Sequence, residues 1–215
     1  MEQINEFQYI FELFTLLISL AVAEMLLGFS RILKLRARRK AGVDPAARKV
    51  KVGWLVPLLG LLVLVDLGTF WNIVWITRDV LDMQMATVFG VLILIGGYYL
   101  VATLVFPDEP ELWPDFDAYY WLQKRFVVWG MFAINVAAQV AIALLGATPS
   151  AEEQGAILAQ HPWFLLAGIF IFLSMPAFVW LALSKGRRTN IALMLFIIFV
   201  QFFYALTAWG IEGLF

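Results

Sequence analysis

Six stretches of the chain consist almost entirely of apolar side chains, and short polar segments separate them. A helix needs roughly 20 apolar residues to cross the ~30 Å hydrocarbon core of a bilayer, and each stretch provides about that number or more. Inside lipid every backbone polar group must be bonded within its own segment, so the pattern predicts six transmembrane helices. Their predicted positions are about 7–35, 53–76, 83–106, 119–146, 163–183 and 191–209.

The composition agrees with this pattern. Of the 215 residues, 63% are hydrophobic and 14% are charged, and the mean hydropathy is +0.86. A soluble domain is only about 45–50% apolar. The ten-residue segments of alternating polarity that mark an outer-membrane barrel do not occur in the sequence. We therefore expect an all-α fold: a polytopic transmembrane helical bundle in which residues 1–215 form a single domain.

Lysine and arginine cluster in the first and last of the five connections between the apolar stretches, and Lys124 and Arg125 follow the third. Eight of them lie in 34–51 and three in 184–190, whereas 77–82 and 147–162 together contain only Arg78. Cytoplasmic connections of membrane proteins are enriched in these two residues. The asymmetry predicts that 34–51 and 184–190 face the cytoplasm and that both termini do not. Connection 34–51 is also predicted to attract anionic lipids of the bilayer.

Several functional classes lack the residues they need. The chain has no cysteine and a single histidine, His161, which excludes thiolate metal sites and metal or haem sites built on several histidines. Gly-rich phosphate loops, GxSxG and HExxH are absent from the sequence. The net charge of −1 gives no reason to expect a nucleic-acid partner. We predict no catalytic residue, no metal and no cofactor, and expect that the protein is not an enzyme.

Two carboxyl groups fall inside predicted membrane helices, where ionisable side chains are costly and mark candidate functional sites. Glu24 lies ten residues before Lys34, ~15 Å from the cytoplasmic end of its helix. Asp66 lies twelve residues after Trp54, ~18 Å into the next helix. If the two carboxyl groups face each other across neighbouring helices, they are expected to share a proton.

Other polar or small side chains occupy a similar depth in the remaining helices, about 10–16 Å from their cytoplasmic ends. This layer is open to two interpretations. It is either an interhelical hydrogen-bond network that only stabilises the bundle, or a pathway for protons, cations or a small cationic ligand. The candidates on these helices, besides Glu24 and Asp66, are Tyr98, Tyr99, Asn135, Ser174 and Gln201.

The connection 107–118 contains three prolines and five acidic residues, and it faces the same side as the basic connection 34–51. Opposite charges at one membrane face suggest a contact between the two connections, but a solvated linker, with Asp115 or Asp117 helping to start the next helix, is the favoured alternative. At the end of the first helix, Arg31 lies ~10 Å along the axis from Glu24, too far for direct pairing, and is expected to reach the lipid headgroups. The candidates for the contact between connections are Lys49, Lys51, Asp108 and Glu111.

Some segments carry a recognisable pattern. These segments are AEMLLGFSRIL at 23–33, the tyrosine pair 98–99, Phe106-Pro107, and DFDAYY at 115–120 followed by the basic pair 124–125. Together they resemble segments of an uncharacterised family of small six-helix bacterial inner-membrane proteins. The resemblance covers about half of the chain. It implies a multi-pass protein of the bacterial inner membrane, and it implies no activity.

Two functions from different classes remain open. The first is a membrane scaffold or accessory subunit, acting as a homo-oligomer or within a larger membrane complex. The alternative is a small transporter or channel for protons, cations or a small cationic ligand, using the layer around Glu24 and Asp66. Hydration of that layer distinguishes the two, because transport requires water or ions to reach it.

Overall fold

The computed structural model describes residues 6–42, 50–78, 80–81, 84–148 and 150–209. Within these ranges the chain is all-helical, and its only β-type pairing is one isolated bridge. The helices are α1 (Glu6–Ala41), α3 (Leu55–Ile76), α4 (Met85–Thr103), the short 3-10 helix η1 (Pro110–Leu112), α5 (Phe116–Leu144), α6 (Ala151–Gln160), α7 (Pro162–Leu183) and α8 (Arg187–Trp209).

Five of these helices, α1, α4, α5, α7 and α8, are long and apolar enough to cross a membrane. The apolar stretch Leu55–Trp71 of α3 is shorter. Large apolar side chains such as Leu16, Phe126 and Phe172 are exposed on the outer faces of the bundle. A soluble protein rarely exposes so much apolar surface, so the chain is a multi-pass membrane protein.

The described residues form seven α-helices, one more than the six membrane helices that the sequence predicts. Each predicted apolar stretch coincides with one long helix, and the additional helix, α6, lies in the connection 147–162. Its sequence AEEQGAILAQ is rich in strong helix formers but has no long apolar run. A search for membrane-spanning runs does not detect such a helix.

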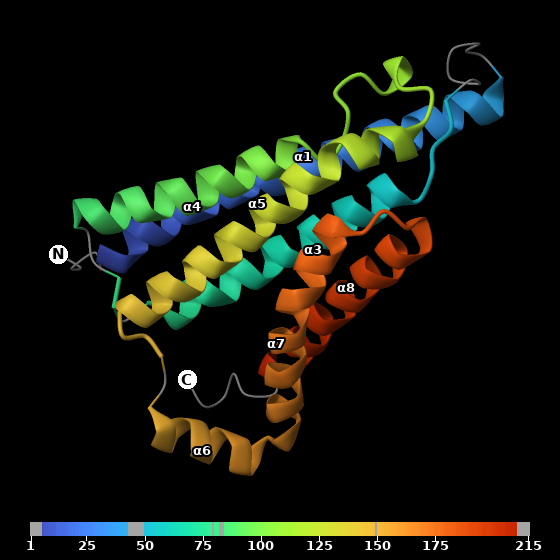
Figure 1. Ribbon diagram of the computed structural model, residues 1–215. Helices are drawn as coiled ribbons and strands as arrows, with labels where there is room; N and C mark the ends of the chain where they lie inside the picture. Colours follow the sequence, from blue (N-terminus) through green and yellow to red (C-terminus); the bar gives the residue numbers. More distant parts are fainter. Residues whose placement is uncertain (1–5, 43–49, 79, 82–83, 149, 210–215) are drawn as a thin grey trace.

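The helices α1, α3, α4 and α5 run alongside one another, α8 packs along α3, and α7 packs between α5 and α8 (Figure 1). The helix α6 packs against α7 and projects from one end of the bundle (Figure 1). At the opposite end, the last turns of α1, the first turns of α3, the segment between α4 and α5 and the turn between α7 and α8 come together (Figure 1). We call this the basic end, because these segments, together with the helix ends that adjoin them, contain most of the lysine and arginine of the sequence.

The first helix reaches further than expected, continuing from 35 to Ala41 through a basic segment. Arginine, lysine and alanine are strong helix formers, so the helix persists beyond its apolar part. It ends at Gly42, whose φ of 71° is the left-handed conformation that closes many helices.

Phe106, just after α4, locks α1 and α3 together near the basic end. A Cβ added at Gly28 or Gly60 would collide with the Phe106 ring, so both glycines are required for this close approach. The ring also makes an edge-to-face contact with Phe29, with centroids 5.0 Å apart. One aromatic side chain thereby fixes the relative position of three helices.

Candidate functional site

Asp66 lies in the middle of α3 and is only 1% exposed. Its carboxylate accepts hydrogen bonds from three neighbouring helices. The Tyr98 hydroxyl of α4 and the Asn135 amide of α5 both donate to Oδ2, the latter at 3.0 Å. The Gln201 amide of α8 donates to Oδ1. This Asp66 network joins four helices at one point.

The partners of Asp66 are themselves held in place. Asn135 also donates to the carbonyl oxygen of Met131, one turn earlier, at 3.0 Å. The fully buried ring of Tyr98 stacks edge-to-face on Phe70 of α3, with centroids 5.1 Å apart. These second contacts restrict the rotamers of both donors, so the hydrogen-bond geometry around the carboxylate is preorganised.

Asp66 makes no ion pair within the described part of the chain. All three of its hydrogen-bond donors are neutral groups. A carboxylate has about four acceptor positions, so three hydrogen bonds leave room for one more donor or for a cation. A buried charge without a counter-ion is costly in a low-dielectric interior, which favours a proton or a cation at this group.

A cavity of about 100 Å³ adjoins the carboxylate. Seven of its eleven lining side chains are polar, and a polar cavity of this size has room for several water molecules. The oxygen Oε1 of Gln201 is buried and has no hydrogen-bond partner among the described residues. The lining residues are Asp66, Thr69, Asn135, Gln139, Ile171, Ser174, Met175, Phe178, Val200, Gln201 and Tyr204.

The structure brings together five of the seven residues considered for the polar layer. Asp66, Tyr98, Asn135 and Gln201 form the network, and Ser174 lines the cavity, with its hydroxyl donating to the Ile171 carbonyl at 2.7 Å. Two residues lie elsewhere. Tyr99, next to Tyr98 in α4, is partly buried and packs against the apolar core, and Glu24 belongs to a different cluster.

Glu24 pairs with Arg31, with 3.5 Å between Oε1 and Nη1. The expectation that these two were too far apart was wrong. It counted the ~10 Å of helix axis but neglected the reach of a long arginine side chain, which in a helix leans back toward the N-terminus. The same Nη1 lies 3.5 Å from Oδ1 of Asp108. Arg31 thus bridges two carboxylates, and no described contact joins Glu24 to Asp66.

The two connections expected to meet at the basic end do contact each other, but through the backbone. The Lys51 amide donates to the Pro114 carbonyl at 2.8 Å, and the Phe116 amide donates to the Lys51 carbonyl at 3.0 Å. Asp108 pairs with Arg31 instead of a lysine. Lys49 and the side chain of Glu111 lie outside the described residues.

A second buried polar cluster was missed by sequence reasoning. Lys124 of α5 is 4% exposed, and its ammonium group donates to the carbonyls of Leu181 and Ser184 and to Oδ1 of Asn190. Asn190 is fully buried and accepts the Tyr120 hydroxyl at 2.7 Å. The ammonium therefore caps the end of α7.

A sequence signal for this cluster did exist. Lys124 and Arg125 are adjacent, and neighbouring residues on a helix point about 100° apart. One of two such cations can therefore face a neighbouring helix while the other stays exposed, as Lys124 and Arg125 do. The position of its partner Asn190, 66 residues later, could not be read from spacing.

The comparisons with known proteins identify no relative: the chain matches no protein-family model, no curated protein and no solved structure.

Proposed function

We propose that the protein is a small transporter or channel of the bacterial inner membrane, and that Asp66 binds the proton or small cation it moves. One observation carries this proposal: a buried carboxylate held by three neutral donors, without an ion-pair partner in the described residues, beside a polar cavity. A purely structural network has no need of a charge at this position, because an amide could accept and donate with the same shape.

The dimensions of the cavity limit what can bind. About 100 Å³ accommodates water, a proton carrier such as hydronium, or a monovalent cation that keeps part of its hydration shell. Oδ1 of Asp66 and Oε1 of Gln201 both offer oxygen, the ligand atom that hard cations prefer. The alternative of a small cationic organic ligand is less favoured, since a larger molecule would have to displace lining side chains.

Six membrane crossings with both termini outside the cytoplasm form the second part of the proposal. The basic end carries the lysine and arginine enrichment typical of cytoplasmic faces, and the 22 residues of α3 are long enough for a sixth crossing. The resemblance of 23–33 and 115–120 to bacterial inner-membrane proteins supports the location. A periplasmic reporter fused after residue 215 should be active, and a cytoplasmic reporter there should be inactive. The opposite result would show that the C-terminus faces the cytoplasm and would contradict the proposed topology.

Flux through reconstituted protein tests the function. Liposomes containing the full chain, given a proton, sodium or potassium gradient, should dissipate one of these gradients faster than protein-free liposomes. Asp66→Asn should reduce the rate to that of protein-free liposomes. Glu24→Gln is the matched control, because it removes a carboxylate outside the Asp66 network and should leave the rate unchanged. Equal flux by wild type and Asp66→Asn, or no flux of any of the three cations, would refute transport through Asp66.

A scaffold or accessory subunit of a larger membrane complex is the second candidate. Its support is that Asp66 already accepts three hydrogen bonds, so the four helices are held together without a ligand. Under this hypothesis the protein copurifies with stoichiometric partners and shows no flux. Isolation from native membranes in mild detergent, followed by identification of bound proteins, distinguishes it from an independent transporter.

A further inference from the structure

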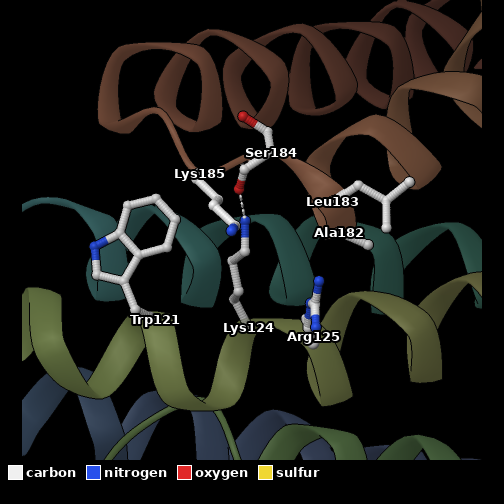
Figure 2. A pocket seen from close by; sticks show the side chains of 7 residues that line it. All are labelled: Trp121, Lys124, Arg125, Ala182, Leu183, Ser184 and Lys185. Carbon is white, nitrogen blue, oxygen red and sulfur yellow. Dashed lines mark hydrogen bonds between the residues drawn. The ribbon is translucent and has the colours of Figure 1, made fainter.

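A second cavity, of about 260 Å³, lies at the basic end, between α5 and the turn that joins α7 to α8 (Figure 2). It is separate from the Asp66 network and shares no lining residue with the Asp66 cavity. Figure 2 shows Lys124 pointing from α5 toward the turn, with Lys185 and Trp121 on one side and Arg125 on the other. The lining residues are Trp121, Lys124, Arg125, Ala182, Leu183, Ser184 and Lys185.

The lining of this cavity is strongly cationic. It contains three cations, Lys124, Arg125 and Lys185, and no acidic side chain. Lys124 is occupied by three hydrogen bonds, to the carbonyls of Leu181 and Ser184 at the end of α7 and to Asn190. Arg125 and Lys185 are exposed and form no ion pair within the described residues. Like charges gathered this closely repel one another unless an anion neutralises them.

The surroundings of the cavity are apolar. Leu122 and Phe126 of α5 and Trp180 of α7, each within two residues of a lining residue, are large exposed side chains, and so is Leu183 in the lining itself. In a membrane protein such side chains contact acyl chains, and a tryptophan beside a cation is typical of the headgroup level. Trp121 fits this position, with its ring centroid 4.8 Å from the Lys124 ammonium nitrogen.

We propose that this cavity binds a phosphate group. The Arg125 guanidinium can donate two parallel hydrogen bonds to phosphate oxygens, and Lys185 can add a third charged donor from the opposite wall. The phosphate belongs either to the headgroup of an anionic phospholipid, with its acyl chains along Leu122 and Trp180, or to a soluble phosphate compound. This site differs from the diffuse attraction of lipids to the basic connection 34–51, because it has defined walls.

Binding by the full chain in detergent tests the proposal, with phosphatidylglycerol, phosphatidylcholine and inorganic phosphate as probes. Native mass spectrometry should show phosphatidylglycerol retained in preference to phosphatidylcholine. Arg125→Ala should weaken retention about fivefold, the loss expected for one cation near a phosphate, and Arg125→Ala with Lys185→Ala should weaken it further. Arg125→Lys keeps the charge but not the two-pronged geometry, so its affinity should fall between those of wild type and Arg125→Ala.

The control is Arg188→Ala, which removes one exposed cation three residues from Lys185 but outside the cavity lining. It should leave binding within about twofold of wild type if the walls of the cavity matter more than net charge. Phosphatidylglycerol retention that resists excess inorganic phosphate supports the lipid source. Binding of radiolabelled phosphate by equilibrium dialysis, with the same sensitivity to Arg125→Ala, supports the soluble source. Equal losses with Arg188→Ala and Arg125→Ala, or no binding of either probe, would overturn the proposal.

Discussion

The side-chain amide of Gln201 donates to Asp66 across 135 positions of sequence, while the amide's own oxygen is buried without a partner in the described residues. A glutamine amide has donors on one side and an acceptor on the other, and rotation by half a turn exchanges them. Gln201 can therefore present either a donor or an acceptor to Asp66 and to the adjoining cavity. Rotation of the Gln201 amide can therefore accommodate a change in the charge of Asp66 without movement of the helices.

This versatility predicts contrasting effects of two substitutions at Asp66. Asp66→Asn should leave stability within about 1 kcal/mol of wild type, because its amide oxygen can accept from Tyr98 and Asn135 while Gln201 turns its oxygen toward the new donor. Asp66→Leu should destabilise the protein by at least about 3 kcal/mol, since three buried donors lose their acceptor. Thermal unfolding of both variants in the same detergent measures the difference. Equal destabilisation by both would mean that Gln201 does not adapt.

The packing of Phe106 predicts that alanine substitutions at two glycines will have different effects on stability. Gly28→Ala should destabilise the protein by about 1–3 kcal/mol, because its methyl group collides with the Phe106 ring. Gly68→Ala, on α3, is the matched control, since a Cβ there meets nothing within 4 Å. It should be neutral, or stabilising by up to about 1 kcal/mol through helix propensity. A Gly28→Ala protein that unfolds at the wild-type temperature would show that Phe106 does not lock the helices.

The contact between the connections at the basic end predicts a specific cross-link. Lys51 and Asp115 are partners in a parallel bridge, and neighbouring strands lie about 4.8 Å apart, within the ~4.4–6.8 Å between Cα atoms that a disulfide spans. Because the chain has no native cysteine, Lys51→Cys with Asp115→Cys should form an intramolecular disulfide on mild oxidation. Non-reducing electrophoresis after proteolysis between the two sites detects it. Lys51→Cys with Asp108→Cys is the control and should remain reduced, because Asp108 pairs with Arg31 instead.

Depth along a helix could be predicted from the sequence, whereas direction around it could not. A fixed rise per residue, counted from a membrane interface, placed Asp66, Asn135 and Gln201 in one layer, and these three do meet. The same count placed Glu24 in the layer, although its side chain turns toward Arg31. In a helix that is apolar on all sides, no hydrophobic periodicity indicates which face is buried.

Side-chain reach and partners distant in sequence were equally hard to predict. The pairing of Arg31 with both Glu24 and Asp108 depends on a long, flexible side chain and on a loop whose path only the fold determines. The capping of α7 by Lys124 depends on the packing of α7 against α5, which no local sequence signal specifies. These contacts are products of tertiary structure.

Cavity hydration predicts which cysteine substitutions react with a water-soluble thiol reagent. Ser174 and Gln139 line the Asp66 cavity. The reagent should therefore label Ser174→Cys and Gln139→Cys proteins in membranes. Ala21→Cys is the matched control for Ser174→Cys, because it replaces a small, fully buried residue of α1 that lines neither cavity. It should remain unlabelled. Protection of all three positions would mean that the layer is dry, and would favour the scaffold over the transporter.

The central claim is that Asp66 gains and loses a proton, or exchanges it for a small cation. Infrared difference spectroscopy of the reconstituted protein, on a change of pH or cation concentration, tests this claim most directly. The account predicts a carboxylic-acid C=O band whose intensity changes in wild type and in Glu24→Gln, and which is missing in Asp66→Asn. Identical difference spectra from wild type and Asp66→Asn would contradict it, because Asp66 would then keep one charge state under all conditions.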